Sequence, residues 1–116
     1  MRSSKVSILM ATYNGERHLK AQIESIIGQS KIDWKLCCSD DGSSDQTLSL
    51  LTSAQSVDER IKLLPPRTGK KGHVGNFEYL LNYALEIGDD WIFLADQDDI
   101  WLPHKLQVLL HLAECE

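Results

Sequence analysis

The chain has 116 residues, of which 42% are hydrophobic and 25% are charged, and its formal net charge at pH 7 is −5. Composition and length suit one globular domain, residues 1–116, that can bury a hydrophobic core. The acidic balance argues against nucleic acid as a partner. No apolar run approaches the roughly 18 residues that a membrane-spanning helix needs, and residues 1–5 lead into a strand pattern rather than a signal-peptide core.

The chain contains three cysteines, Cys37, Cys38 and Cys115. Their spacing fits neither a metal site nor a disulfide framework. Cys37 and Cys38 are adjacent within an apolar stretch, where an unpaired cysteine acts as a small hydrophobic side chain. We therefore expect a reducing, cytoplasmic compartment.

Apolar runs and helical periodicities alternate along the chain. Strands are expected at residues 5–11, 34–39, 60–64 and from Trp91 to about Asp96. Helices are expected at 16–29, after a cap at Ser44 or Asp45, from a cap at Asn76 to a stop at Gly88, and from Pro103 onward. Residues 67–75 are expected to form a Gly/Lys-rich loop. The order β-α-β-α-β-α-β-α predicts an α/β fold, a mostly parallel sheet flanked by helices.

The stretch Trp91–Asp99 carries five apolar residues directly into a group of carboxylates, Asp96, Asp98 and Asp99. The apolar run is typical of a central strand in a parallel sheet. Ligands of such sheets bind at the carboxyl ends of the strands. Close carboxylates repel one another unless a cation lies between them, and Mg²⁺ or Mn²⁺ would accept these oxygen ligands. The alternative is a solvated acidic turn that caps the next helix.

Two further loops follow strands, at Thr12–Gly15 and Asp40–Asp45, and would converge on the same edge of the sheet. The ring of Tyr13 could stack on a base, and Asp41 or Asp40 could accept a hydrogen bond from it. Three cationic side chains that could pair with phosphate follow the third strand: Arg67, Lys70 and Lys71. Two histidines lie near the site loops in the sequence: His73 and His104. The alternatives are a half-buried turn aromatic, a turn with a helix cap, and a solvated basic loop.

Three segments carry a family resemblance: residues 6–15 (VSILMATYNG), 39–47 (SDDGSSDQT) and 94–106 (LADQDDIWLPHKL). In this order and at these strand ends they resemble family 2 glycosyltransferases of the GT-A fold, over nearly the whole chain. The helix start at residues 76–78 and the Asp-Gln-Asp-Asp sequence are most similar to the rhamnosyltransferase-like, polysaccharide-synthesis branch.

The resemblance implies a role for each matching residue. Tyr13 would pack against the base of the donor, Asp41 would bind the base imide, and Asp96 would lie near the ribose. Asp98 would ligate Mg²⁺ or Mn²⁺ bridging the diphosphate, as in a DXD motif. The implied donor-nucleotide residues are Thr12, Tyr13, Asn14, Asp40, Asp41 and Asp96.

The implied reaction transfers a sugar from a UDP-, dTDP- or GDP-sugar to a hydroxyl of a saccharide or lipid-linked acceptor, with inversion and metal dependence. The location would be cytoplasmic, with peripheral attachment at the inner membrane face left open. The catalytic base of the family has no matching position, since family members continue past the helix that follows residues 96–99. We expect an apparently truncated chain, without the acceptor half, that self-associates through an exposed apolar face.

Two other interpretations stay open. The chain could be a non-catalytic nucleotide-sugar-binding module, which turnover measurements would separate from an enzyme. It could also be a receiver-like phospho-acceptor domain, which is α/β with aspartates at strand ends. That class needs an acidic pair after the first strand, where this sequence has Thr12-Tyr13-Asn14.

Overall fold

The computed structural model describes residues 5–29, 32–67, 72–95, 100–102 and 105–114. Strands and helices alternate through the chain, which confirms the expected element order. The elements are β1 (Val6–Thr12), α1 (Glu16–Ile27), β2 (Trp34–Asp40), α2 (Thr47–Val57), β3 (Ile61–Leu63), α3 (His73–Ile87), β4 (Trp91–Ala95) and α4 (Lys105–Glu114).

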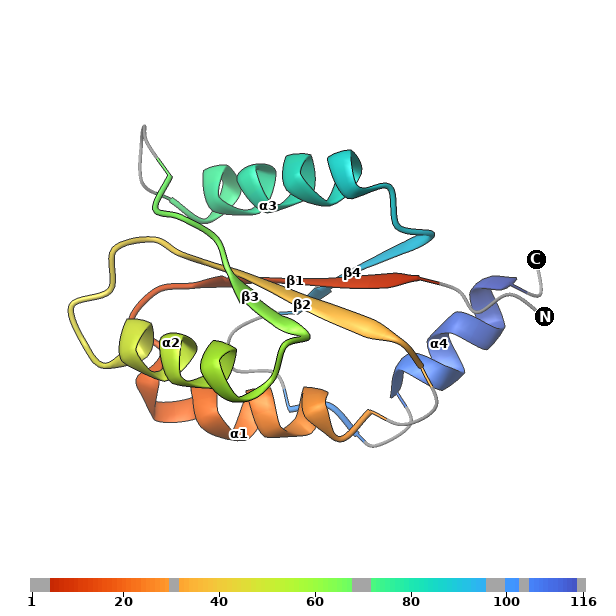
Figure 1. Ribbon diagram of the computed structural model, residues 1–116, viewed down its shortest axis with the longest axis horizontal. Helices are drawn as coiled ribbons and strands as arrows, with labels where there is room; N and C mark the ends of the chain where they lie inside the picture. Colours follow the sequence, from red (N-terminus) through yellow and green to blue (C-terminus); the bar gives the residue numbers. More distant parts are fainter. Residues whose placement is uncertain (1–4, 30–31, 68–71, 96–99, 103–104, 115–116) are drawn as a thin grey trace.

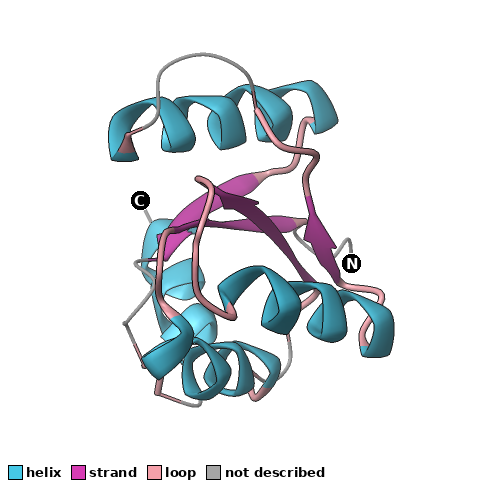
Figure 2. Cartoon of the chain, turned by 90° about the vertical axis from the view of Figure 1, so that its left-hand side faces the viewer, coloured by secondary structure: helices cyan, strands magenta, loops and turns pink. Residues whose placement is uncertain are grey.

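The four strands form one sheet in the order β3-β2-β1-β4, and all three neighbouring pairs are parallel. Helix α3 covers one face, and α1 and α2 cover the other (Figures 1 and 2). Helix α4 contributes to the core on the same side as α1. The predicted α/β class with a parallel sheet between helices is confirmed, because parallel strands need crossover helices that bury both faces.

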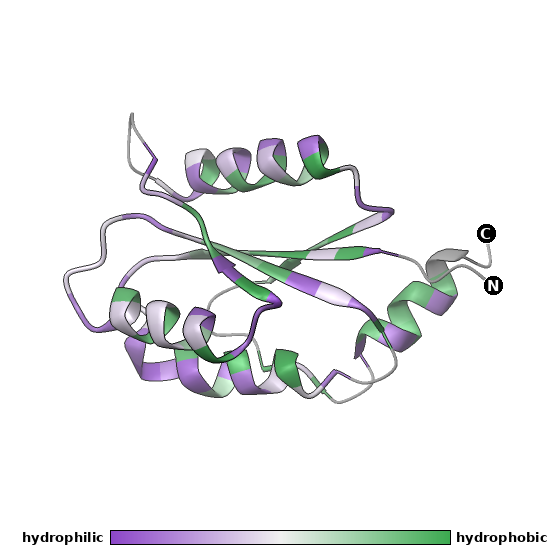
Figure 3. Cartoon of the chain, viewed as in Figure 1, coloured by the Kyte–Doolittle hydropathy of each residue, from purple (hydrophilic) through white to green (hydrophobic). Residues whose placement is uncertain are grey.

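Strand β1 is the centre of the core, and all seven of its residues are buried. Successive side chains point to opposite faces of a strand. Ile8 and Met10 belong to the core cluster that includes α1, whereas Leu9 and Ala11 pack in the cluster that includes α3. Figure 3 shows apolar residues along β1 and also on the helices, including α4. None of the described helices is long and apolar enough to cross a membrane.

Helix α3 begins earlier than the sequence pattern suggested. It starts at His73, so the expectation that Asn76 caps this helix is wrong, as is the loop expected up to residue 75. Asn76 is instead buried inside the helix, where its side-chain Nδ2 donates to the Ser39 carbonyl at 2.8 Å. The Nδ2 donor therefore has a strand carbonyl as its acceptor, whereas Asn76 Oδ1 is buried and has no hydrogen-bond partner among the described residues. The expected stop at Gly88 is confirmed by its left-handed φ of 75°.

Strand β4 is an edge strand of the described sheet, so its expected central position is wrong. It pairs only with β1 among the described strands, and Leu94 is 62% exposed. A continuous apolar run indicates burial without specifying which neighbours provide it. β1, not β4, has a strand on each side.

Asp89 and Asp90 lie at the amino end of β4, away from the strand ends that would bind a ligand. The Asp89 carboxylate accepts a hydrogen bond from the Ser7 hydroxyl and pairs with Lys35 Nζ at 3.2 Å. Asp90 accepts the backbone N–H of Lys5 at 2.9 Å. Both carboxylates therefore hold the amino ends of strands together.

Both cysteines of β2 are buried free thiols, as the sequence predicted. Burial raises the pKa of Cys37 and of Cys38 above the ordinary thiol value. A thiol with a raised pKa is a weak nucleophile and packs as an apolar side chain. Cys115 and Pro103 lie outside the described residues.

Candidate functional site

The described parts of three connecting loops meet at the carboxyl ends of the parallel strands: residues 13–15 after β1, 41–46 after β2, and 64–67 with Gly72 after β3. The ladder places Thr12 opposite Asp40, and the Asp41 backbone N–H extends this pairing by donating to the Thr12 carbonyl at 2.9 Å. The first two segments of the candidate site are therefore neighbours, as expected from the topology.

Asn14 ties the first loop to the second. Its φ is 49°, a left-handed value that asparagine tolerates better than most residues. In this conformation its backbone N–H donates to Ser43 Oγ at 2.8 Å, and its side-chain Oδ1 accepts the Ser44 N–H at 2.8 Å. The structure thus gives Asn14, an expected nucleotide-binding residue, a role in holding the two loops together.

Asp45 and Thr47 organise the start of both α1 and α2. The Thr47 hydroxyl accepts the Gly15 N–H at 2.8 Å and donates to Asp45 Oδ1 at 2.5 Å. Asp45 also accepts the N–H groups of Thr47 at 2.9 Å and Glu16 at 3.2 Å. The hydrogen bond from the Thr47 hydroxyl is the main cause that lowers the Asp45 pKa.

The cap of α2 differs in detail from the expectation. Gln46 occupies the cap position and makes no side-chain capping bond, whereas Asp45, one residue earlier, accepts the first helical N–H. Of the two residues suggested as caps, Asp45 therefore satisfies the helix end, and Ser44 instead donates to Asn14. Carboxylates near a helix start are also stabilised by the helix dipole.

Asp40 is held by its own loop and by Thr12 at the end of β1. Oδ1 accepts the hydroxyls of Thr12 at 2.8 Å and Ser43 at 2.6 Å, and Oδ2 accepts the N–H groups of Gly42 at 3.2 Å and Ser43 at 2.8 Å. A carboxylate offers about four lone-pair positions. These four donors fill them, so the Asp40 carboxylate holds the loop after β2 in shape.

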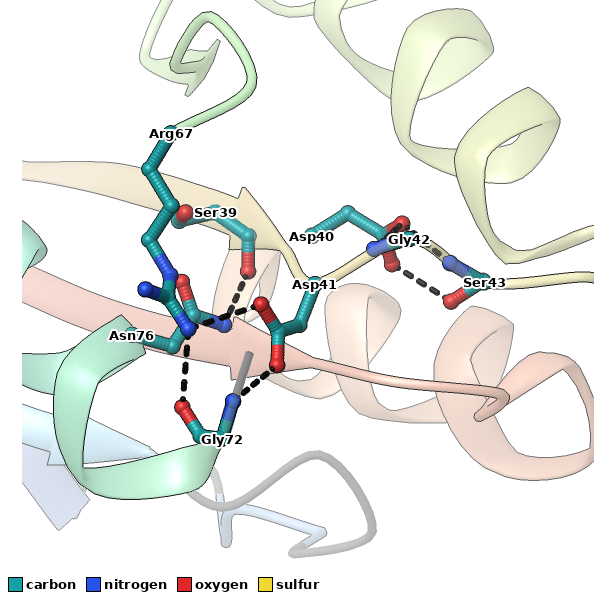
Figure 4. Close-up of polar contacts among 8 residues, drawn as sticks. All are labelled: Ser39, Asp40, Asp41, Gly42, Ser43, Arg67, Gly72 and Asn76. Atoms are coloured by element: carbon teal, nitrogen blue, oxygen red, sulfur yellow. Dashed lines mark hydrogen bonds and ion pairs between the residues drawn. The ribbon is translucent and has the colours of Figure 1, made fainter. Parts of the chain in front are cut away.

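Asp41 has different partners and points toward the third loop (Figure 4). Its Oδ1 accepts Arg67 Nη2 at 2.8 Å, and its Oδ2 accepts the Gly72 N–H at 2.6 Å. Gly72 has a φ of 147°, which a residue with a side chain rarely adopts. Asp41 therefore brings the segment after β3 to the strand end, and among the described residues these two donors leave lone-pair positions on its carboxylate.

The remaining expected site residues have the following positions. Tyr13 is 54% exposed at the end of β1. Arg67, expected to pair with phosphate, is instead paired with Asp41. His73 packs edge-on against Phe77, with ring centroids 4.8 Å apart. Within the described residues no three His, Cys, Asp or Glu side chains form a metal site. Outside the described residues lie Lys70, Lys71, Asp96, Asp98, Asp99 and His104.

Sequence reasoning missed two long-range contacts of this site. The Arg67–Asp41 ion pair joins residues 26 positions apart, and the bond from Asn76 to Ser39 joins residues 37 apart. Neither produces a periodicity or a short motif. The only available signal was that polar residues follow strands whose carboxyl ends must meet.

Comparisons with known proteins agree with this fold. The model of the family described as "Glycosyl transferase family 2" matches residues 7–115. The chain is 37% identical over 99 residues to the dTDP-rhamnosyl transferase RfbG of Shigella flexneri, covering 84% of this chain and 34% of that protein. It is 36% identical over 107 residues, 92% of this chain and 40% of the relative, to the Escherichia coli UDP-Glc:alpha-D-GlcNAc-diphosphoundecaprenol beta-1,3-glucosyltransferase WfgD.

A solved structure shows the same fold. The mannosyltransferase PcManGT from Pyrobaculum calidifontis, in complex with GDP-Man and Mn²⁺, superposes with a TM-score of 0.73 at 18% identity, covering 86% of this chain and 29% of that one. The α/β architecture is thus that of GT-A glycosyltransferases. The chain spans 34% and 40% of the two relatives. Since the family model matches almost its entire length, the chain belongs to glycosyl transferase family 2.

Proposed function

We propose that this chain is the donor-binding part of a glycosyltransferase that takes a sugar from a nucleoside-diphosphate sugar and transfers it to an acceptor hydroxyl. The observation that carries the proposal is the Asp41 carboxylate, which is fixed at the end of β2 with lone pairs left for a ligand. Tyr13, exposed at the neighbouring strand end, offers a ring for the base. Family membership provides the class of donor.

In this proposal Asp41 accepts the ring N–H of the base. Asp40, Thr12 and Asn14 keep the surrounding loops in place, since their polar groups bond within and between those loops. The names of similar proteins include dTDP, UDP and GDP donors. Uracil, thymine and guanine each carry a ring N–H that a carboxylate can accept, whereas cytosine and adenine have a bare nitrogen there. The shared chemistry favours a donor of the first group.

We further propose that Asp98 ligates Mg²⁺ or Mn²⁺, with Asp96 near the ribose. Carboxylate oxygens suit both ions, and a similar structure contains Mn²⁺ beside its GDP-sugar. When bound, the cation would act as a Lewis acid for the diphosphate leaving group. The acceptor oxygen would bond to the anomeric carbon as the bond to the diphosphate breaks, with inversion. The acceptor proton would pass to a base that no residue of this chain matches.

For the acceptor we propose a saccharide or a lipid-linked saccharide, in polysaccharide or glycoconjugate synthesis. The name of WfgD specifies an acceptor attached to diphosphoundecaprenol. A lipid-linked acceptor would place the enzyme in the cytoplasm, peripherally at the inner membrane face.

We also propose that the chain self-associates. Leu94 on the open edge strand, and Val108 and Leu112 on α4, are more than half exposed. Exposed apolar side chains on an unpaired edge favour association with another chain. Sedimentation velocity should show dimers or larger species, and a clean monomer at high concentration would contradict this part of the proposal.

Titration calorimetry tests the donor site. The chain is titrated with UDP, dTDP, GDP, CDP and ADP, each with and without Mn²⁺. The proposal predicts that one of the first three binds best and that Mn²⁺ strengthens its binding. Absence of binding by a chain that circular dichroism shows to be folded would overturn it. Turnover of the matching nucleotide-sugar then separates an enzyme from a non-catalytic binding module.

A further inference from the structure

Arg67 is an enclosed cation at the candidate site. Its guanidinium Nη2 donates both to Asp41 Oδ1 at 2.8 Å and to the Gly72 carbonyl at 3.1 Å. The side chains of Arg67 and Asp41 are only 10% and 11% exposed. A pair this enclosed has lost most of its water, so each charge depends on the other for stabilisation.

The first turn of α3 is shaped to accept this guanidinium. A Cβ added at Gly75 would lie 3.2 Å from Arg67 Nη1, 3.4 Å from Nη2 and 3.5 Å from Cζ. The absence of a side chain at Gly75 therefore allows the helix to lie directly against the plane of the cation. Arg67 is held between α3 and Asp41 (Figure 4), so its planar group has little freedom to rotate.

The two donors on Asp41 leave the carboxylate both oriented and able to accept. Arg67 occupies one oxygen and Gly72 the other. Since a carboxylate has about four lone-pair positions, one position on each oxygen remains for a ligand. The neighbouring Asp40 has no such capacity, because four donors already occupy it.

We propose that Arg67 is a positioning residue that orients Asp41 toward the ring N–H of the donor base and so sets selectivity among bases. This inference rests on the proposed function. A carboxylate fixed in one orientation accepts a hydrogen bond from a base with a ring N–H and repels a base that presents a lone pair at that position. Arg67 would act through Asp41, without touching the nucleotide itself, and Gly75 would keep its guanidinium in place.

The test compares nucleotide binding by the 116-residue chain and its variants. Calorimetry with UDP, dTDP, GDP, CDP and ADP is performed on the wild type, Arg67→Gln, Arg67→Lys and Gly75→Ala. The control is Arg60→Gln, which removes a bidentate ion pair with Asp58 before β3, at the opposite end of that strand. Circular dichroism melting is recorded for every variant.

For Arg67→Gln we expect affinity for the preferred nucleotide to fall at least about tenfold, because charge-assisted hydrogen bonds to a buried carboxylate are lost. The weak affinities for CDP and ADP should change by less than about twofold, since neither base bonds to Asp41 through a ring N–H. Arg67→Lys should recover part of the selectivity, because lysine keeps the charge without the planar fork. Gly75→Ala should lower the selectivity among the five nucleotides, and Arg60→Gln should leave that selectivity unchanged.

A double-mutant cycle decides whether Arg67 acts through Asp41. In the Asp41→Asn background, adding Arg67→Gln should cost no further affinity. Fully additive losses, equal losses for all five nucleotides, or wild-type selectivity in Arg67→Gln would each overturn the inference while leaving the donor site standing. If Arg67→Gln does not fold, Arg67→Lys and Gly75→Ala provide the same comparison. If the folded wild type binds no nucleotide, the proposed function itself fails.

Discussion

Asp40 and Asp41 are adjacent in the sequence, yet their carboxylates bond to different parts of the molecule. Asp40 accepts hydrogen bonds from Thr12, Gly42 and Ser43, within and beside its own loop. Asp41 accepts from Arg67 and Gly72, which lie before and at the start of α3. One carboxylate is structural and the other is available to a ligand, so substitutions at the two positions should have different consequences.

Asp40→Asn should destabilise the fold. The amide would present N–H groups to donors that now bond to a carboxylate oxygen, at a cost of about 1–3 kcal/mol. Urea denaturation measures the loss, with Asp33→Asn as the control, because Asp33 is exposed. A free energy of unfolding equal to that of the wild type would show that the four hydrogen bonds contribute no net stability.

Asn14→Ala and Asn14→Gly should separate backbone strain from hydrogen bonding. Both remove the acceptor for the Ser44 N–H and both must adopt the φ of 49°, which glycine adopts readily and alanine only with strain. The left-handed conformation costs a residue with Cβ about 1–2 kcal/mol, so the alanine variant should be the less stable by about 1 kcal/mol. Thermal melts of the two variants provide the comparison, and equal stabilities would mean that this strain is negligible.

Tyr13→Ala should weaken binding of the preferred nucleotide by about 1–3 kcal/mol if the ring stacks on the base as in other base–aromatic platforms. Stability should change little, because the side chain is 54% exposed. Tyr13→Phe keeps the ring and is the matched control. An unchanged dissociation constant for Tyr13→Ala, measured by calorimetry, would leave the ring without a role in binding.

Asp98→Ala should remove the increase in nucleoside-diphosphate affinity that Mn²⁺ produces. The expected loss follows from the role of a carboxylate as a hard ligand for the ion that bridges the diphosphate. The measurement is the ratio of affinities with and without Mn²⁺, and Asp33→Asn again is the control. The same ratio in wild type and Asp98→Ala would assign the metal to other residues.

Asp45→Asn should change the pH dependence of stability. The Asp45 pKa is lowered in the folded protein, chiefly by the Thr47 hydroxyl. A lowered folded-state pKa contributes stability above the unfolded value, near pH 4, and that contribution is lost as the pH falls through the folded value. Melting temperatures of wild type and variant should therefore differ at pH 7 and converge as the pH falls through the folded-state pKa of Asp45. A difference independent of pH would exclude ionised Asp45 as its source.

The sequence by itself determined the alternation of strands and helices and which loops carry the polar residues. Apolar periodicity is a local property, because each element must bury one face of a helix or both faces of a parallel strand. It was enough to place β1, β2 and α1 within a few residues and to predict buried free thiols at Cys37 and Cys38. The predicted order of parallel strands also placed Tyr13 and Asp41 at one edge of the sheet.

Only the tertiary structure decided which strand is central and which of two neighbouring carboxylates remains open to a ligand. Those outcomes depend on contacts between residues far apart in the sequence, such as Arg67 with Asp41 and Asn76 with Ser39. The apolar pattern of a strand does not show which strands lie beside it. The sequence around a loop aspartate does not show which groups donate hydrogen bonds to its carboxylate. Hydrogen-bond geometry is fixed only when the elements pack, which is why Asp40 and Asp41 were equivalent in the sequence and are distinct in the fold.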